Sequence, residues 1–213
     1  VAVTGVQTCA LPILAIGKDV LGSAAGTVSQ SVFVGAGAGL STTGAITNCT
    51  VIGFAAADST STLASVVAIG NDVLGSTTGA VSQSVLVGAG AGAGVTSTIA
   101  DSTILGFNAA DSASSLTGSV AIGKDVLGGA AGAVSQSVFV GAGAGIATTG
   151  AITNCTVIGF GAADSTSTLT SVVAIGKDVL GSFTSAAADS VLVGTGAGLN
   201  VTSAISDSTI MGH

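Results

Sequence analysis

The sequence predicts an all-β fold, a parallel β-solenoid in which each short repeat forms one turn. Three observations support this prediction. The 213 residues include 34 glycines, one proline and no tryptophan or tyrosine, and only 6% of them are charged. A glycine preceded by aliphatic residues recurs at a spacing of 17 or 18 along nearly the whole chain. Gly, Ser, Thr and Val crowd every unit, and these residue types disfavour helix.

The repeat is regular at three levels. The spacings between successive motif glycines run 18, 18 and 17 without a break, so that three units form a 53-residue super-repeat. Residues 17–69 and 123–175 differ at only six positions, so a longer period of two super-repeats is nested over the shorter one. The motif glycines are Gly17, Gly35, Gly53, Gly70, Gly88, Gly106, Gly123, Gly141, Gly159, Gly176, Gly194 and Gly212.

A unit of this length is too short for the common helical repeats, which need roughly 33 residues or more. One turn of solenoid per unit places each strand on the equivalent strand of the next unit, about 4.7–4.9 Å away. Twelve motif positions then predict about 12 turns and a rod about 55 Å long. We expect residues 14–213 to form this single domain.

The segment 1–13 does not follow the repeat. Residues 3–13 contain the proline and resemble a translated sequencing adapter, so we expect a leader that is an artefact of assembly. The alternative is a genuine capping segment.

An aliphatic residue such as Val34 stands one position before the motif glycine, and the position three before it holds Val32, Thr50, Val67 and their equivalents. Alternation along a strand puts these two positions on one face, and we assign that face to the interior. We expect the glycine to form the corner, where a Cβ would be blocked. The alternative is that glycine merely fills space.

The position two before the glycine should then face outward. Its residues repeat a bulky, medium and small order, and a long outward apolar stripe is not typical of a soluble monomer. We therefore predict an interface with another copy of the chain. The alternative is that this row faces inward and the strand is apolar on both sides. The predicted interface residues are Phe33, Val51, Leu86, Ile104, Phe139, Val157, Leu192 and Ile210.

The residues before the glycine carry a resemblance to a known repeat. Gly-Ser-Val-Ala-Ile-Gly at 118–123 and Gln-Ser-Val-Phe-Val-Gly at 30–35 resemble the YadA-like head repeat of trimeric autotransporter adhesins, and similar repeats occur in phage tail-fibre-type proteins. The resemblance covers about residues 14–213 and implies a left-handed parallel β-roll, commonly trimeric, on a cell or virion surface. The turns of that family are typically shorter than these.

Three motifs have chemical interpretations beside simpler ones. An aspartate recurs once per super-repeat, after a lysine in three cases, as in Lys124-Asp125, and after Asn71 in the other. The Lys-Asp pairs could form a charged ladder or a weak cation site, and the simpler interpretation is a solvated turn. Gly-Ala-Gly-Ala-Gly at 35–39 and 141–145 has the composition of a nucleotide loop, but small residues packing at a corner explain it better, because no helix pattern follows. Cys49 and Cys155 should lie six turns apart, about 28 Å, too far to pair with each other.

Composition narrows the function further. With three Lys, no Arg and a net charge of −7, we expect no nucleic-acid partner. We expect no catalysis, cofactor, metal or membrane insertion, because the sequence shows no nucleophile–base set, no ligand cluster and no apolar run of about 18 residues. The sequence predicts a structural, self-associating fibre or appendage protein, extracellular or at a cell surface. The alternatives are an adhesin head or tail-fibre segment that binds a receptor, and an ice-binding solenoid that uses its Thr-rich corners, such as Ser41-Thr42-Thr43.

Overall fold

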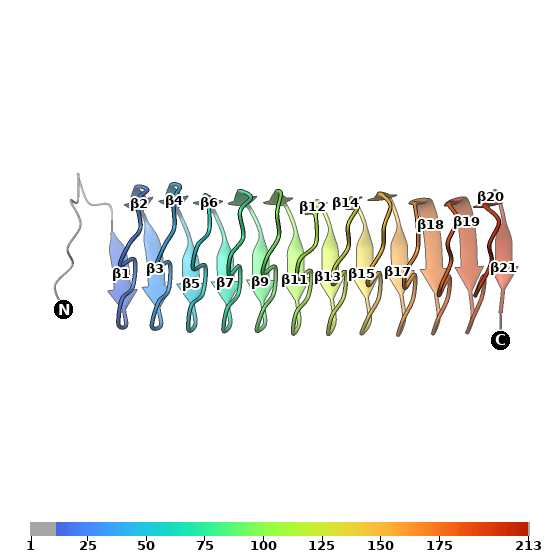
Figure 1. The fold of residues 1–213 in the computed structure, drawn as a ribbon, viewed down its shortest axis with the longest axis horizontal. Helices are drawn as coiled ribbons and strands as arrows, with labels where there is room; N and C mark the ends of the chain where they lie inside the picture. The colour runs from blue at the N-terminus through green and yellow to red at the C-terminus, as the bar shows by residue number, and fades with distance from the viewer. Residues whose placement is uncertain (1–11, 213) are drawn as a thin grey trace.

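The chain forms a straight parallel β-solenoid of about 11 turns, as the computed structural model shows over residues 12–212 (Figure 1). The described residues contain strands, turns and no helix, which confirms the predicted fold class. The motif glycines therefore delimit about 11 turns, one fewer than predicted. Residues 1–11 of the predicted leader lie outside the described residues, and Ile13 already belongs to the first strand.

The first ladder of the solenoid consists of the strands that end at each motif glycine. They pair in parallel along the whole rod and carry side chains both into the core and outward. The strands are β1 (Ile13–Ile16), β3 (Ser31–Val34), β5 (Thr50–Ile52), β7 (Val67–Ile69), β9 (Val85–Val87), β11 (Thr103–Leu105), β13 (Val120–Ile122), β15 (Val138–Val140), β17 (Thr156–Ile158), the second halves of β18 (Leu169–Ile175) and β19 (Ala187–Val193), and β21 (Thr209–Met211).

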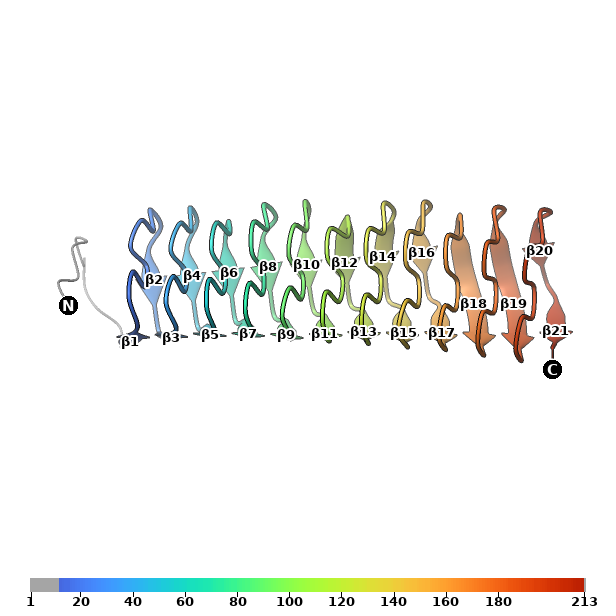
Figure 2. The same ribbon diagram turned by 60° about the horizontal axis from the view of Figure 1, so that its bottom comes forward.

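The second ladder precedes the first in every turn and is seen in Figure 2. Its short strands place one aliphatic residue inward and a small residue outward. They are β2 (Val28–Ser29), β4 (Ile46–Thr47), β6 (Leu63–Ala64), β8 (Val81–Ser82), β10 (Ile99–Ala100), β12 (Ser115–Thr117), β14 (Ala133–Ser135), β16 (Ile152–Thr153), the first halves of β18 and β19, and β20 (Ile205–Ser206).

The register of both ladders follows the sequence repeat. Phe33 pairs with Val51, and Val51 pairs with Ala68, so equivalent positions of successive units lie over one another. The shorter unit keeps this register because its missing residue falls in the coil: Ile46 still pairs with Leu63 in the second ladder. Like positions therefore form straight rows along the rod.

The motif glycines form the corner after the first ladder, as predicted. Eleven of the twelve have φ between 119° and 149°, a region that side chains rarely adopt. A Cβ at Gly141 would also collide with the carbonyl oxygen of Gly159 in the next turn. Both the backbone angle and the distance between turns thus require glycine, which rules out the alternative that it merely fills space.

The third side of the solenoid, between the motif glycine and the second ladder, alternates right- and left-handed residues. In one turn, Asp72, Leu74 and Ser76 have φ of 58°, 56° and 55°. The N–H groups of these left-handed residues point alternately to the two neighbouring turns. Asp72 N donates to Phe54 O of the preceding turn at 2.9 Å, and Leu74 N donates to Ala91 O of the following turn at 3.0 Å. A left-handed conformation costs about 1–2 kcal/mol per residue, a cost offset where these hydrogen bonds satisfy backbone groups that would otherwise be unpaired.

The structure reverses the predicted inside and outside of the first ladder. The predicted interface residues lie in the core: seven are completely buried, and Ile210 packs against the core from the last turn. Residues one and three before the glycine, predicted to be interior, face outward instead. The seven are Phe33, Val51, Leu86, Ile104, Phe139, Val157 and Leu192.

The physical reason is the corner residue between the two ladders. Both faces of the strand are apolar, so alternation alone could not identify the inner one. The residue five before the glycine, such as Asn48 with φ 57°, is left-handed and exposed, and it follows another outward residue, Thr47. Alternation therefore shifts by one at this corner, and buried Ile46 shares the interior with Cys49 and Val51.

The core also explains the three-turn super-repeat. Where the first ladder supplies a bulky residue, the third side supplies glycine: a Cβ at Gly145 would lie 2.7 Å from Cε1 of Phe139 and 2.8 Å from Cδ2 of Leu127. Where the first ladder supplies alanine, as at Ala121, the third side supplies buried Leu127. Medium residues face alanine, as Val157 and Ala163 do. Summed side-chain volume across the core is thereby kept similar in successive turns, as close packing requires.

Replacing a motif glycine should destabilise the fold far more than replacing a nearby glycine. We expect Gly141→Ala to lower the free energy of unfolding by more than about 3 kcal/mol, because it adds both strain and a backbone collision. Gly143→Ala is the control, with φ of 68° but no atom within 4 Å of the added Cβ, and should cost about 1 kcal/mol. Denaturant titration measures both, and equal losses would contradict the corner assignment.

The volume match across the core predicts a compensating pair. Phe139→Ala should cost about 3–5 kcal/mol through a cavity, and Gly145→Leu should cost about 1–3 kcal/mol through overpacking. The double variant recreates the pairing of Ala121 with Leu127 and should recover at least about 1 kcal/mol relative to the sum of the single losses. Purely additive losses in denaturant titrations would show that the two walls are not coupled.

Candidate functional site

The most extensive feature of the surface is the outward side of the first ladder, which we call the outer face. It consists of two rows of side chains along the rod, three and one residues before each motif glycine. The first row is Leu14, Val32, Thr50, Val67, Val85, Thr103, Val120, Val138, Thr156, Val173, Val191 and Thr209. The second row is Ile16, Val34, Ile52, Ile69, Val87, Leu105, Ile122, Val140, Ile158, Ile175, Val193 and Met211.

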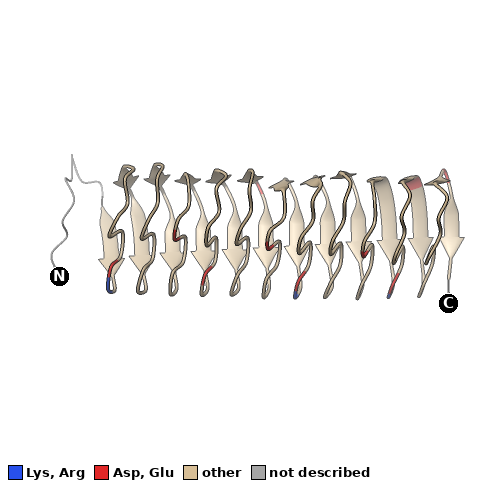
Figure 3. Cartoon of the chain, in the orientation of Figure 1, with Lys and Arg blue, Asp and Glu red and all other residues tan. Residues whose placement is uncertain are grey.

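The outer face is apolar and carries no charge. Val85 and Val191 are 39% and 40% exposed, and other members of both rows are partly or largely exposed along the entire ladder. Charged side chains lie at the turns and edges instead, as Figure 3 shows. An apolar surface of this length that is rimmed by polar groups is typical of an interaction site.

One rim of the outer face is the corner between the two ladders. Its side chains are exposed and mostly amides, acids or serine, and they include Gln30, Asn48, Gln83 and Asp189. The next residue along the chain is usually a buried serine, whose hydroxyl forms hydrogen bonds with backbone groups at the corner. Ser84 Oγ donates to Ser82 O at 2.7 Å and accepts from Ser102 N at 3.1 Å. The corner is therefore well ordered by hydrogen bonds, and its polar side chains remain available to water.

The other rim carries the predicted Lys-Asp pairs. Lys177 Nζ lies 2.8 Å from Asp178 Oδ2, Lys124 contacts Asp125, and Lys18 lies 3.5 Å from Asp19. All of these lysine side chains are largely exposed, so the pairs contribute little to stability. Within residues 12–212, no three His, Cys, Asp or Glu side chains gather as metal ligands would.

The repeated Gly-Ala-Gly-Ala-Gly motif belongs to the third side. Gly37 and Gly39 have φ of 71° and 66° and occupy the same left-handed positions that Asp72 and Leu74 hold in another turn. The intervening Ala38 is completely buried. The motif is thus a packing solution for a turn that carries a bulky core residue, and the nucleotide-loop interpretation has no structural support.

The two cysteines in the described chain are buried and unbonded. Each takes the place of a serine in the row inside the corner, where Cys49 N donates to Ser31 Oγ of the preceding turn at 3.0 Å. Burial raises the pKa of both the Cys49 and the Cys155 thiol above the ordinary value, although backbone hydrogen bonds act in the opposite direction. A buried, protonated thiol is a poor nucleophile, so neither residue marks a reactive site.

One row of the threonines that suggested an ice-binding array is buried, whereas the residues that follow it in the chain, such as Thr43, Thr78 and Thr149, are exposed. Thr42, Thr60, Thr77 and Thr166 are at most 1% exposed, and each donates its hydroxyl to a backbone carbonyl. Thr148, the equivalent residue of another turn, is also buried and has no hydrogen-bond partner for its hydroxyl. Because these hydroxyls face the core, this row cannot present a regular array to ice.

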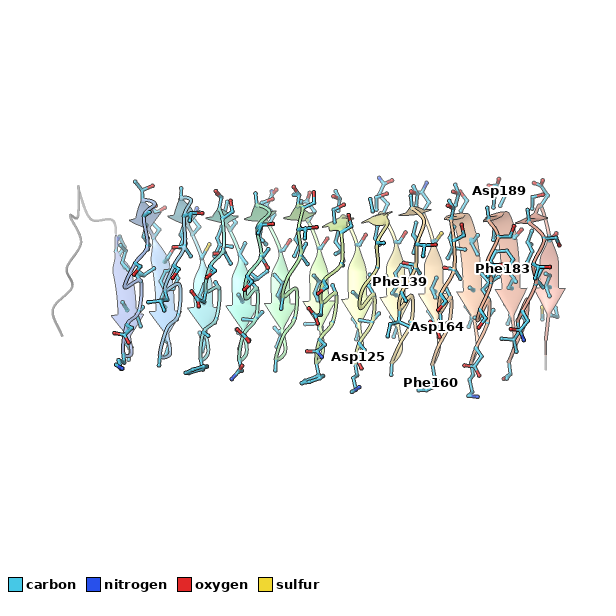
Figure 4. The ribbon with its side chains drawn as sticks, in the orientation of Figure 1. Asp125, Phe139, Phe160, Asp164, Phe183 and Asp189 are labelled. Carbon is cyan, nitrogen blue, oxygen red and sulfur yellow. The ribbon has the colours of Figure 1, made fainter. Side chains whose placement is uncertain are left out.

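A second apolar feature is a widely spaced row of phenylalanines just after the motif glycine. Phe54, Phe107 and Phe160 are 64%, 52% and 63% exposed, and Lys124 Nζ lies 5.9 Å from the ring centroid of Phe107. Figure 4 shows Phe160 at the edge of the rod and Phe139 within it. His213, which follows Gly212 as these phenylalanines follow their motif glycines in the sequence, lies outside the described residues.

Comparison of the sequence with known families and curated proteins found no match. In the part of the chain that the structure describes, no helix is long and apolar enough to cross a bilayer. The likeness to adhesin head repeats therefore stands on the repeat motif and on the solenoid architecture alone.

The outer face was missed as a site because its rows look like an ordinary core. Its residues are nearly all Val, Ile or Leu, with threonine at every third turn in one row. The uniform size of these side chains could have identified the rows as outward-facing. A row that faces a packed core must vary in size to match the opposite wall, as the row two before the glycine does.

Proposed function

We propose that this chain is a structural, non-catalytic rod that associates side by side with copies of itself through the outer face. The observation that carries the proposal is the continuous, uncharged apolar surface along the full length of the first ladder. The proposed interface therefore consists of the two outer rows, in place of the residues predicted from the sequence.

The size of the outer face supports this role. Eleven steps of about 4.8 Å give a length of about 53 Å, and a strand of three residues is about 10 Å wide. Two copies would thus cover about 500 Å² each in projection, near the lower limit of about 1,000 Å² in total for a stable interface.

Two features of the chain support a structural role. The rod is built from backbone ladders and a narrow packed core, an arrangement that provides length and rigidity. A net charge of −7, placed on the rims and on the third side, keeps copies soluble and opposes association by the charged faces. We further propose an extracellular or cell-surface location, which rests on the resemblance to adhesin head repeats.

Receptor binding is a second candidate function, favoured by the exposed phenylalanine row. Phe54, Phe107 and Phe160 recur every three turns, about 14 Å apart, beside polar side chains on the rim. Large exposed aromatic side chains are common in recognition surfaces. This row lies beside the outer face, so receptor binding and lateral association are compatible.

Charges placed on the outer face should disperse the assembly without unfolding the rod. We expect the Val85→Glu/Val191→Glu variant to raise the dissociation constant for self-association at least about 100-fold, because each glutamate would be buried without a partner. Analytical ultracentrifugation measures association, and circular dichroism measures the β structure.

The matched control is Ser82→Glu/Ala188→Glu, which adds the same charge to the second ladder in the same two turns. This control should associate like the parent chain, apart from a small general repulsion. Equal weakening of both variants would mean that charge alone, and not the outer face, governs association. A parent chain that stays monomeric at all concentrations would contradict the proposed function itself.

A further inference from the structure

The threonines of the outer face break an otherwise aliphatic row at regular intervals. Thr50, Thr103, Thr156 and Thr209 lie three residues before the motif glycine in every third turn. Among the described residues, the hydroxyls of Thr50, Thr103 and Thr156 have no hydrogen bond within the chain, and these side chains are partly exposed to water. These threonines are the polar side chains of the outer face, and lateral association would remove water from them.

A hydroxyl in a dry interface needs a partner. Leaving one buried and unpaired costs about 1–3 kcal/mol, whereas two facing hydroxyls satisfy each other by donating and accepting. Four such residues in each copy therefore penalise every alignment in which threonine meets Val, Ile or Leu. Alignments in which threonine meets threonine occur only at intervals of three turns.

The two rows of the outer face also discriminate between orientations. If two rods pack face to face and point the same way, a two-fold axis along the rod exchanges the rows, and each threonine meets an aliphatic residue of the other row. If the rods point in opposite directions, the axis runs along the strands and each row faces itself. Only the second orientation brings threonine rows together.

We propose that the partner on the outer face is a second copy in antiparallel orientation, aligned by the facing threonines. This proposal rests on the proposed function and specifies its geometry. Two alignments satisfy it with nearly complete overlap. In one, Thr103 faces its own counterpart and Thr50 faces Thr156. In the other, Thr50 faces Thr209 and Thr103 faces Thr156. A single polar residue type in an apolar seam sets register in coiled coils by the same physics.

Intermolecular distances between spin labels test the orientation. Single labels at Gln30, Gln83 and Gln136, which are equivalent corner positions three turns apart, are placed in a chain whose Cys49 and Cys155 are serine and whose Cys9 is also replaced. Antiparallel rods predict different distances at the three positions, with axial separations of about 38, 10 and 19 Å in the first alignment or about 53, 24 and 5 Å in the second. Parallel rods predict the same distance at all three positions, which would overturn the inference.

Replacing the threonines tests the register. The variant with Thr50, Thr103, Thr156 and Thr209 all changed to Val should still associate, but its distances should broaden into several values separated by about 5 Å, one solenoid step. The matched variant with all four changed to Ser keeps the hydroxyls and should retain narrow distances. Narrow, unchanged distances in the Val variant would overturn the role of the threonines. Absence of any intermolecular coupling in the parent chain would instead contradict the proposed function.

Discussion

The whole structure depends on the closeness of successive turns at the motif glycine. At this corner the carbonyl group of the next turn occupies the space that a Cβ would need, and the backbone adopts an angle that glycine accepts. This contact fixes where each turn ends. Once the corner is fixed, the register of both ladders follows, and every other residue type is placed in a row above and below its equivalents. The same contact recurs from turn to turn, which explains why the residue at this corner does not vary.

The super-repeat of three turns is a consequence of packing. A core as narrow as this one cannot hold Phe and Leu opposite each other in the same turn. A bulky residue on the first ladder therefore faces glycine on the third side, a medium residue faces alanine, and alanine faces leucine. The outer face needs no such compensation, which explains why its rows stay uniform. The same distinction between a varied row and a uniform row separates the part of the chain that stabilises the rod from the part available for association.

The fold could be predicted from the sequence because spacing alone specifies it. A short unit of nearly constant length, with glycine at a fixed place, excludes helical repeats and demands parallel stacking. The position of the association surface could not be predicted in the same way, because Val34 and Phe33 are both apolar and alternation does not say which is inside. The left-handed corner at residues such as Asn48, which shifts the alternation by one, has no strong sequence signal: Gln, Asn, Asp, Ser and Gly all occur there. The alternative in which the varied row faces inward was the correct one.

The central claim is that each glycine-delimited unit adds one step to a continuous rod, with like residues over like. Intramolecular spin-label distances on dilute protein test it most directly, from Gln30 to Gln83, Gln136 and Asp189, which lie three, six and nine turns away. The distances should rise linearly, to about 14, 29 and 43 Å. Distances that do not increase in proportion to the number of intervening units would contradict the solenoid and everything inferred from it.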